Sequence, residues 1–124
     1  MSKHVQFNNN PLIYTDLGFF LKNSLEYLFN NNILKETVNN ILLKIWVILD
    51  DEYIHYLTKK YTSMRFDYDL EYVGLELLKE LIEYNINIIN NNSIINVNDL
   101  LDFINLKIKY KKILNDSIKT IILK

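Results

Sequence analysis

Apolar side chains on almost every side of one predicted helix, residues 35–57, constrain most strongly what this chain can fold into. One stripe with helical spacing consists of Val38, Leu42, Ile45, Trp46, Leu49 and Tyr53. The remaining sides carry Ile41, Leu43, Val47, Ile48 and Ile54. Such a helix must be covered on most sides, because each Leu or Ile side chain left exposed forgoes roughly 1.5–3 kcal/mol. We therefore expect either the second half of the chain or another polypeptide to cover the surplus.

A shorter helix is predicted in front of it, over residues 16–29. Its apolar residues recur at steps of three and four and so share one face. They are Leu17, Leu21, Leu25 and Leu28. The polar residues 30–32 are enough only for a short loop, which favours an antiparallel helical hairpin spanning residues 16–58.

The spacing of apolar residues changes in the second half of the chain. Apolar and charged residues alternate over 64–72 and again over 104–111, and a period of two is typical of a β-strand. The second alternation places Ile104, Leu106, Ile108 and Tyr110 on one side and Lys107, Lys109 and Lys111 on the other. Residues 62–124 are therefore predicted to form a β-rich lobe with an Asn-rich loop at about 85–98. The expected fold class is α+β.

Two segments of this lobe fit more than one structure. Leu75, Leu78, Leu81 and Ile82 return to helical spacing. Residues 117–123 fit either a returning antiparallel strand or a short terminal helix.

Composition excludes several classes of protein. The formal net charge is −1, whereas a protein that grips phosphates alone carries a basic excess. The chain contains no cysteine, which excludes disulfides, thiolate catalysis and cysteine metal sites. Residues 1–15 are predicted to form a polar arm interrupted by Pro11, without the apolar core of a signal peptide. No apolar run approaches the roughly 20 residues needed to cross a bilayer, so we expect no membrane contact and a place in the cytosol or nucleus.

The residue inventory argues against an enzyme, and we expect no catalytic, cofactor-binding or metal-binding residue. His4 lies in the polar arm. His55 follows Asp51 and Glu52 by about one helical turn, a spacing that could present metal ligands, but no further ligand motif completes a site. Local charge pairs at a solvated helix end explain this group better.

Basic residues gather at two places and are candidates for proximity to DNA. They are Lys59, Lys60 and Arg65 in the middle of the chain, and Lys107 and Lys109 on the predicted final strand. Ammonium groups on one side of a strand can meet a phosphate backbone together. Lysines that protect a strand edge from aggregation would give the same pattern.

Residues 15–46 carry a run of positions that matches a known family without a gap. The run consists of Thr15, Leu17-Gly18, Leu21, Ser24-Leu25-Glu26, Leu28, Leu34, Val38, Leu42-Leu43 and Trp46. In this run the chain resembles the start of the small (gamma) subunit of the general transcription factor IIA. Phe66 and Leu70 keep the spacing of that family's first β segment, and residues 106–109 look like its final strand. The family's aromatic segment that ends in a Trp has no counterpart in residues 75–84.

The resemblance implies a two-lobed heterodimer subunit in the nucleus. The helical hairpin would supply half of a four-helix bundle shared with the large subunit, and the strands would complete a shared β-barrel. The implied bundle contacts are Leu17, Leu21, Leu25, Leu28, Val38, Leu42, Ile45, Trp46 and Leu49. The family binds the complex of the TATA-binding protein with promoter DNA and stabilises it for RNA polymerase II, without enzymatic activity, so DNA would be reached indirectly or through few phosphate contacts.

A second interpretation remains open beside this one. The helical spacing at residues 75–82 and the apolar C-terminal segment also fit a self-contained, all-helical module that binds other proteins as an adaptor or regulator.

Overall fold

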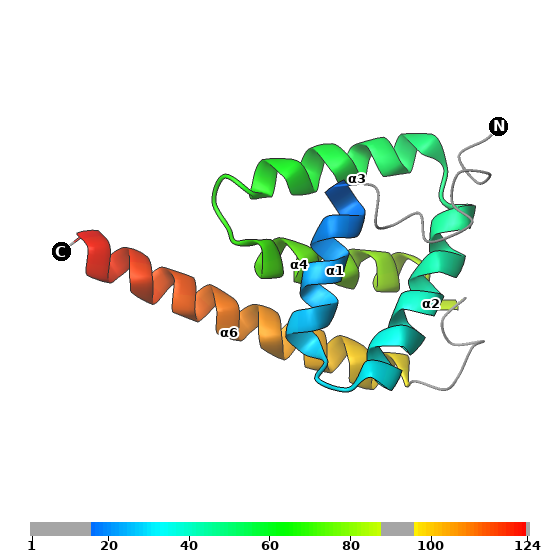
Figure 1. Ribbon diagram of the computed structural model, residues 1–124. Coiled ribbons are helices and arrows are strands. Elements are labelled where there is room, and N and C mark those ends of the chain that lie inside the picture. The colour runs from blue at the N-terminus through cyan, green and yellow to red at the C-terminus, as the bar shows by residue number, and fades with distance from the viewer. Residues whose placement is uncertain (1–15, 88–95, 124) are drawn as a thin grey trace.

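The computed structural model describes residues 16–87 and 96–123, with side chains to residue 116, and these residues contain helices and no β-strand (Figure 1). The helices are α1 (Asp16–Leu28), α2 (Asn32–Ile48), α3 (Asp51–Met64), α4 (Leu70–Tyr84) and α6 (Val97–Leu123). The expected α+β fold, with strands for a shared β-barrel, is therefore wrong. The polar arm predicted for residues 1–15 lies outside the described residues.

The first predicted strand, residues 64–72, is a helix end, a turn and a helix start. Met64 ends α3, Phe66 is exposed in the turn, and Leu70 begins α4. The carboxylate of Asp69 accepts a hydrogen bond from the backbone N–H of Tyr72 at 2.8 Å and so caps α4. Capping by Asp satisfies an N–H group that has no partner within the helix, so Asp69 within this alternating segment marks the start of α4.

The second predicted strand, residues 104–111, lies within α6. In a helix, Ile104 and Lys111 share one side, and both are buried. Leu106 and Tyr110, which a strand would place with Ile104, are exposed. Apolar residues occupy two different faces of this helix, one buried and one exposed. Together they produce an alternation that resembles that of a strand.

The predicted Asn-rich loop at about 85–98 is described only at its ends. The side-chain amide of Asn85 donates to the carbonyl of Leu81 at 2.9 Å at the end of α4. The Asn96 side chain accepts from the backbone N–H of Asp99 at 3.1 Å at the start of α6. These asparagine side chains form hydrogen bonds with backbone groups at helix ends, as residues of this type do at turns.

The helix predicted over 16–29 is confirmed as α1, whereas the helix predicted over 35–57 is two helices. The chain leaves helical geometry at Leu49, and Asp50 caps α3 by accepting from the backbone N–H of Tyr53 at 2.7 Å. Asp51 and Glu52 follow in the first turn, where negative charge favours the helix dipole. α3 then continues to Met64, across the predicted boundary between the hairpin and the second lobe.

One hydrophobic core connects all of these helices. α1 crosses α4, and α6 packs against α4 on the side opposite to α3 (Figure 1). A Cβ atom on Gly74 would lie 2.2 Å from the carbonyl oxygen of Phe20 and 2.8 Å from the Cβ of Ser24. The two helices therefore cross at a distance that only glycine allows. The buried Ser24 hydroxyl donates to the carbonyl of Leu21 at 2.8 Å, so this hydroxyl has a hydrogen-bond partner at the crossing.

Candidate functional site

The nine residues expected to contact a large subunit all lie in the chain's own core. They are Leu17, Leu21, Leu25, Leu28, Val38, Leu42, Ile45, Trp46 and Leu49. Each of them is buried, so none presents a surface to a partner in this conformation. Apolar patterning identified the residues that need cover, but it does not tell whether that cover comes from the same chain.

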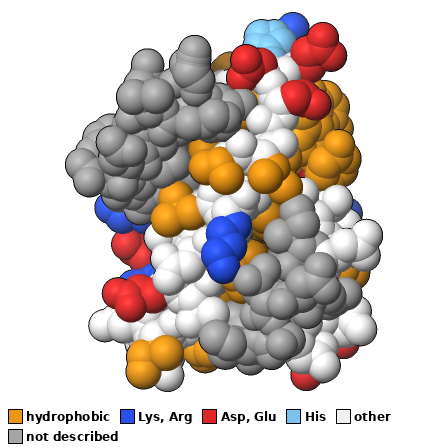
Figure 2. Space-filling model, turned by 90° about the vertical axis from the view of Figure 1, so that its right-hand side faces the viewer, with side chains coloured by type: hydrophobic (Ala, Val, Ile, Leu, Met, Phe, Trp, Pro, Cys, Tyr) orange, Lys and Arg blue, Asp and Glu red, His pale blue; other side chains and the backbone are white. Residues whose placement is uncertain are grey.

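Of the predicted surplus, Ile41 is buried, whereas other apolar residues of α2 reach the surface at its two ends. Ile33, Leu34, Val47 and Ile48 are exposed, two near each end of the helix. On the face of the molecule that carries α2, apolar side chains are interspersed with polar atoms and a basic side chain (Figure 2).

The five candidate DNA-proximal residues do not form one basic surface. The ammonium group of Lys60 lies 2.8 Å from a carboxylate oxygen of Glu80. The guanidinium of Arg65 donates to the carbonyl of Tyr68 at 2.8 Å. Lys107 lies over the ring of Phe103, 5.5 Å from its centroid. Lys59 and Lys109 are exposed, on α3 and α6 respectively.

Lys111, the residue beside this set, is a structural cation. Its ammonium group lies 2.8 Å from Asp69 and 3.4 Å from Glu71, and 5.0 Å from the centroid of the Tyr27 ring. Burial acts to lower the pKa of Lys111, but the hydrogen bond and charge of Asp69, together with Glu71, outweigh it and raise the pKa above its usual value. Lys111 therefore stays charged and joins α6 to α1 and to the start of α4.

The group around His55 remains at the surface. His55, Asp51 and Glu52 are all exposed on α3. Among the residues that the structure describes, no three His, Asp or Glu side chains are placed to hold a metal ion. Within the same residues, no helix is both long and apolar enough to span a membrane.

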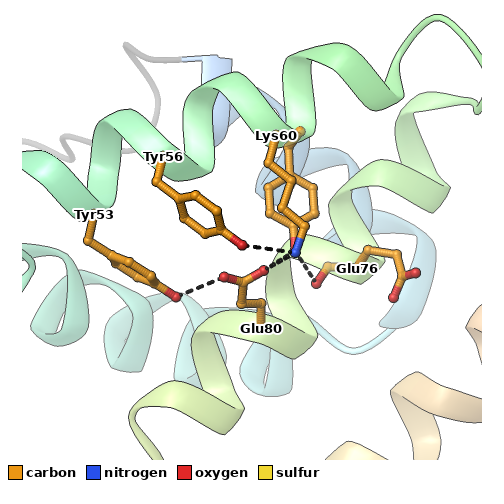
Figure 3. A network of polar contacts seen from close by, with 6 residues as sticks. Tyr53, Tyr56, Lys60, Glu76 and Glu80 are labelled. Carbon is orange, nitrogen blue, oxygen red and sulfur yellow. Dashed lines mark hydrogen bonds and ion pairs between the residues drawn. The ribbon is translucent and has the colours of Figure 1, made fainter.

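The densest polar cluster joins α3 to α4 around the carboxylate of Glu80 (Figure 3). Tyr53 donates its hydroxyl to Glu80 at 3.0 Å, Lys60 donates at 2.8 Å, and Tyr61 donates through a short hydrogen bond. We call Glu80, Tyr53, Lys60 and Tyr61 the Glu80 cluster. Each donor comes from α3, and the single acceptor comes from α4.

Protonation in the Glu80 cluster is unsuited to acid–base catalysis. Burial and then the hydrogen bonds to Glu80 raise the pKa of Tyr53 and Tyr61 well above that of a free tyrosine. The hydrogen bond to Glu80 raises the pKa of Lys60. For Glu80 itself, burial acts to raise the pKa, but the hydrogen bonds from Lys60, Tyr61 and Tyr53 outweigh burial and lower it. A general acid or base needs a pKa near the working pH, and every shift here moves away from neutrality.

An open pocket lies between the turn that follows α1 and the start of α6. Its volume is about 420 Å³, and its apolar walls are Leu28, Phe29, Leu34, Leu100 and Phe103. The rings of Phe29 and Phe103 pack with their centroids 6.0 Å apart. Asn and Asp side chains line the rest, and none belongs to a catalytic arrangement. The pocket can receive an apolar side chain. Phe103 in its wall also begins a row of apolar side chains along α6.

A row of exposed apolar side chains runs along α6. Leu106, Tyr110 and Ile113 are 63%, 61% and 56% exposed, and Phe103, partly buried, precedes them. We call Phe103, Leu106, Tyr110 and Ile113 the α6 stripe. These residues are spaced three, four and three apart, so they share one face of the helix. This face was not predicted, because the alternation of apolar and charged residues over 104–111 indicated a strand.

The opposite side of α6 holds the helix firmly against the rest of the molecule. Leu100 and Ile104 are buried in the core, and Lys111, about two turns beyond Ile104, forms its ion pairs with Asp69 and Glu71. Beyond this anchor, the C-terminal part of α6 extends past the other helices (Figure 1). The structure therefore presents the α6 stripe on a fixed helix that points away from the core.

Over residues 16–87 and 96–123, the fold and this surface define the class of the protein as a helical domain with an exposed apolar helix face. Comparison with models of known families, with curated proteins and with solved structures finds no match to the chain.

Proposed function

We propose that the chain is a non-enzymatic, self-contained helical module that binds an amphipathic helix on its α6 stripe. The single observation that carries this proposal is the exposure of Leu106, Tyr110 and Ile113 on one face of an otherwise anchored helix. Large apolar side chains gathered on one surface of a soluble domain mark interaction sites.

The spacing of the stripe favours a helix as the bound element. Steps of three and four along an exposed face are those by which two helices interlock their side chains. Covering Leu106, Tyr110 and Ile113 would contribute roughly 1.5–3 kcal/mol for each fully buried side chain, before the cost of association. The pocket lined by Phe29 and Phe103 lies where such a helix would continue.

The chemistry of the polar groups supports binding over catalysis. The Glu80 cluster is held in the protonation states that its members already adopt in water near neutral pH, which suits a structural link between α3 and α4. Binding by surface burial needs no reactive group.

Site-specific photo-cross-linking tests this proposal. Tyr110 is replaced by p-benzoylphenylalanine in the full chain, and Phe66, which is 88% exposed in the turn between α3 and α4, is replaced in the same way as a control. We expect Tyr110 to cross-link to a defined polypeptide whose attached peptide has helical apolar spacing, and Phe66 to give none. Equal labelling from both positions, or none from either, would reject the α6 stripe as a binding surface.

A second candidate is the role implied by the resemblance in residues 15–46, the small subunit of transcription factor IIA. It is favoured by the agreement between the matched run and the helix–turn–helix formed by α1 and α2. Only the helical part of that role is proposed, and the bundle residues now buried in the core would have to be exposed for pairing. Nuclear location and RNA polymerase II transcription belong to this candidate.

A gel-shift assay separates the second candidate from the first. The chain is co-expressed with a large subunit of transcription factor IIA and added to the TATA-binding protein on TATA-containing DNA. A slower-migrating complex that requires both subunits would support the transcriptional role. A chain that stays unpaired and leaves the gel shift unchanged would reject it while leaving the first proposal intact.

A further inference from the structure

We propose that the helix bound on the α6 stripe is α6 of a second copy of this chain, in parallel and in register. This inference rests on the proposed function and names the partner of the same surface. It follows from the heptad positions of the residues on α6 and from the charges beside the stripe.

The stripe has the spacing of a coiled-coil seam. Phe103 and Tyr110 fall at heptad position a, and Leu106 and Ile113 fall at position d. With about 100° of rotation per residue, the buried Ile104 and Lys111 at position b lie on the far side of the helix. The seam of one copy can therefore meet the seam of another while the two helical bodies stay on opposite outer sides.

The charges beside the stripe are complementary in a parallel pair. Asp102 is at position g and Lys107 is at position e of the next heptad, and these two positions face each other across parallel helices. Asp102 of each copy would thus lie opposite Lys107 of the other, giving two equivalent ion pairs. Lys107 already lies over the ring of Phe103, at the edge of the seam.

The same charges disfavour the antiparallel pair. An antiparallel arrangement that stacks Leu106 on Tyr110 of the other copy places position g against g and e against e. Lys109 would then face Lys109 of the second copy, and Lys107 would face Lys107. Like charges at these positions oppose pairing. In the parallel pair, by contrast, Lys109 at position g lies opposite Leu114 at position e of the other copy. The methylene groups of Lys109 can cover this Leu114.

The exposed part of the seam is short, so self-association should depend on concentration. Three exposed layers, Leu106, Tyr110 and Ile113, span about two turns of helix. We therefore expect monomer and dimer in exchange, which sedimentation equilibrium over a range of concentrations can measure.

Disulfide trapping tests the direction of the helices. The native chain contains no cysteine, so the full chain with Tyr110→Cys carries a single thiol. In the parallel pair, position 110 of one copy faces position 110 of the other. We expect this variant to form a covalent dimer under mild oxidation, and Phe66→Cys, which is more exposed but lies in the α3–α4 turn, to form far less. If Tyr110→Cys links only to Leu106→Cys in a mixture, the helices are antiparallel and the inference is wrong.

A charge exchange tests the pairing without changing the apolar residues. Asp102→Lys and Lys107→Asp should each weaken self-association by roughly threefold to tenfold, because each alters two equivalent ion pairs. The double variant should restore it. Circular dichroism should remain that of the native chain, because Asp102 is exposed and Lys107 lies at the surface. Failure of the double variant to recover, with the single variants weakened, would overturn the Asp102–Lys107 assignment.

The outcomes for this inference and for the proposed function can be told apart. A chain that is monomeric at every concentration, but whose position 110 cross-links to a different polypeptide, overturns self-pairing and leaves the proposed function standing. A monomeric chain with no specific cross-link overturns both. A dimer that persists when Leu106→Asp is introduced overturns the inference, since the interface would then lie elsewhere.

Discussion

At the scale of single residues, two positions decide how the helices fit together. Gly74 allows α4 to approach the backbone of α1 more closely than any side chain would permit. Glu80 collects three hydrogen bonds from α3. Neither role was predicted from the sequence, because an isolated Gly or Glu in a helical segment has no pattern that distinguishes it from its neighbours.

The substitution Glu80→Gln should lower the free energy of unfolding by about 1–3 kcal/mol at neutral pH, because Lys60 loses its ion pair and two tyrosine hydroxyls lose a charged acceptor. Glu83→Gln, exposed on the same helix, should change it by less than about 0.5 kcal/mol. Urea unfolding followed by circular dichroism measures both.

The difference in free energy of unfolding between the native chain and Glu80→Gln should depend on pH in a defined direction. The pKa of Glu80 is lower in the folded chain than in the unfolded one, so its stabilising contribution is present above the unfolded value of about 4.3 and is lost as the pH falls through the folded value. Native chain and Glu80→Gln should therefore converge in stability in acid. A difference that persists unchanged at low pH would show that the carboxylate charge is not its cause.

At the scale of elements, helix ends rather than apolar runs set where the helices begin. Asn31, Asp50 and Asp69 cap α2, α3 and α4 through hydrogen bonds from their side chains to backbone N–H groups. The apolar pattern continues through Asp50, so a single helix was predicted where α2 and α3 are separate. A capping residue inside an apolar run is a local signal that could have located the break.

Asp69 has a second role that Asp50 lacks, because its other carboxylate oxygen pairs with the buried Lys111. We expect Asp69→Ala to cost about 2–3 kcal/mol and Asp50→Ala about 1 kcal/mol, since both lose a cap but only the first leaves a buried cation short of a partner. Asp69→Asn, which can still cap, should fall between them. Equal costs at the two caps, measured by chemical unfolding, would argue against a stabilising role for the Lys111 ion pair.

At the scale of the whole molecule, a single core replaces the two predicted lobes. Residues from all five described helices meet in it, and Trp46 is buried within it. The helical hairpin therefore receives its cover from within the chain, at least over Val38, Leu42 and Ile45.

This arrangement predicts the behaviour of the isolated chain. Trp46→Ala should reduce the free energy of unfolding by about 3–5 kcal/mol, because it leaves a large cavity in the shared core. Val47→Ala, at an exposed position one residue further on, should cost far less. Tryptophan fluorescence and far-ultraviolet circular dichroism of the native chain should report one cooperative, predominantly helical transition. Separate transitions for the two halves would contradict the single core.

The sequence by itself determined which leucines of the first helix are buried, where that helix lies and which cysteine chemistries the chain lacks. These follow from composition and from spacing within one helix, both of which are local. Only the tertiary structure decided that residues 64–72 and 104–111 are helical and that α2 is covered from within. It also decided that the exposed apolar face belongs to α6. A two-residue alternation fits a strand or two faces of a helix equally well, and contacts between residues far apart in the chain select between them.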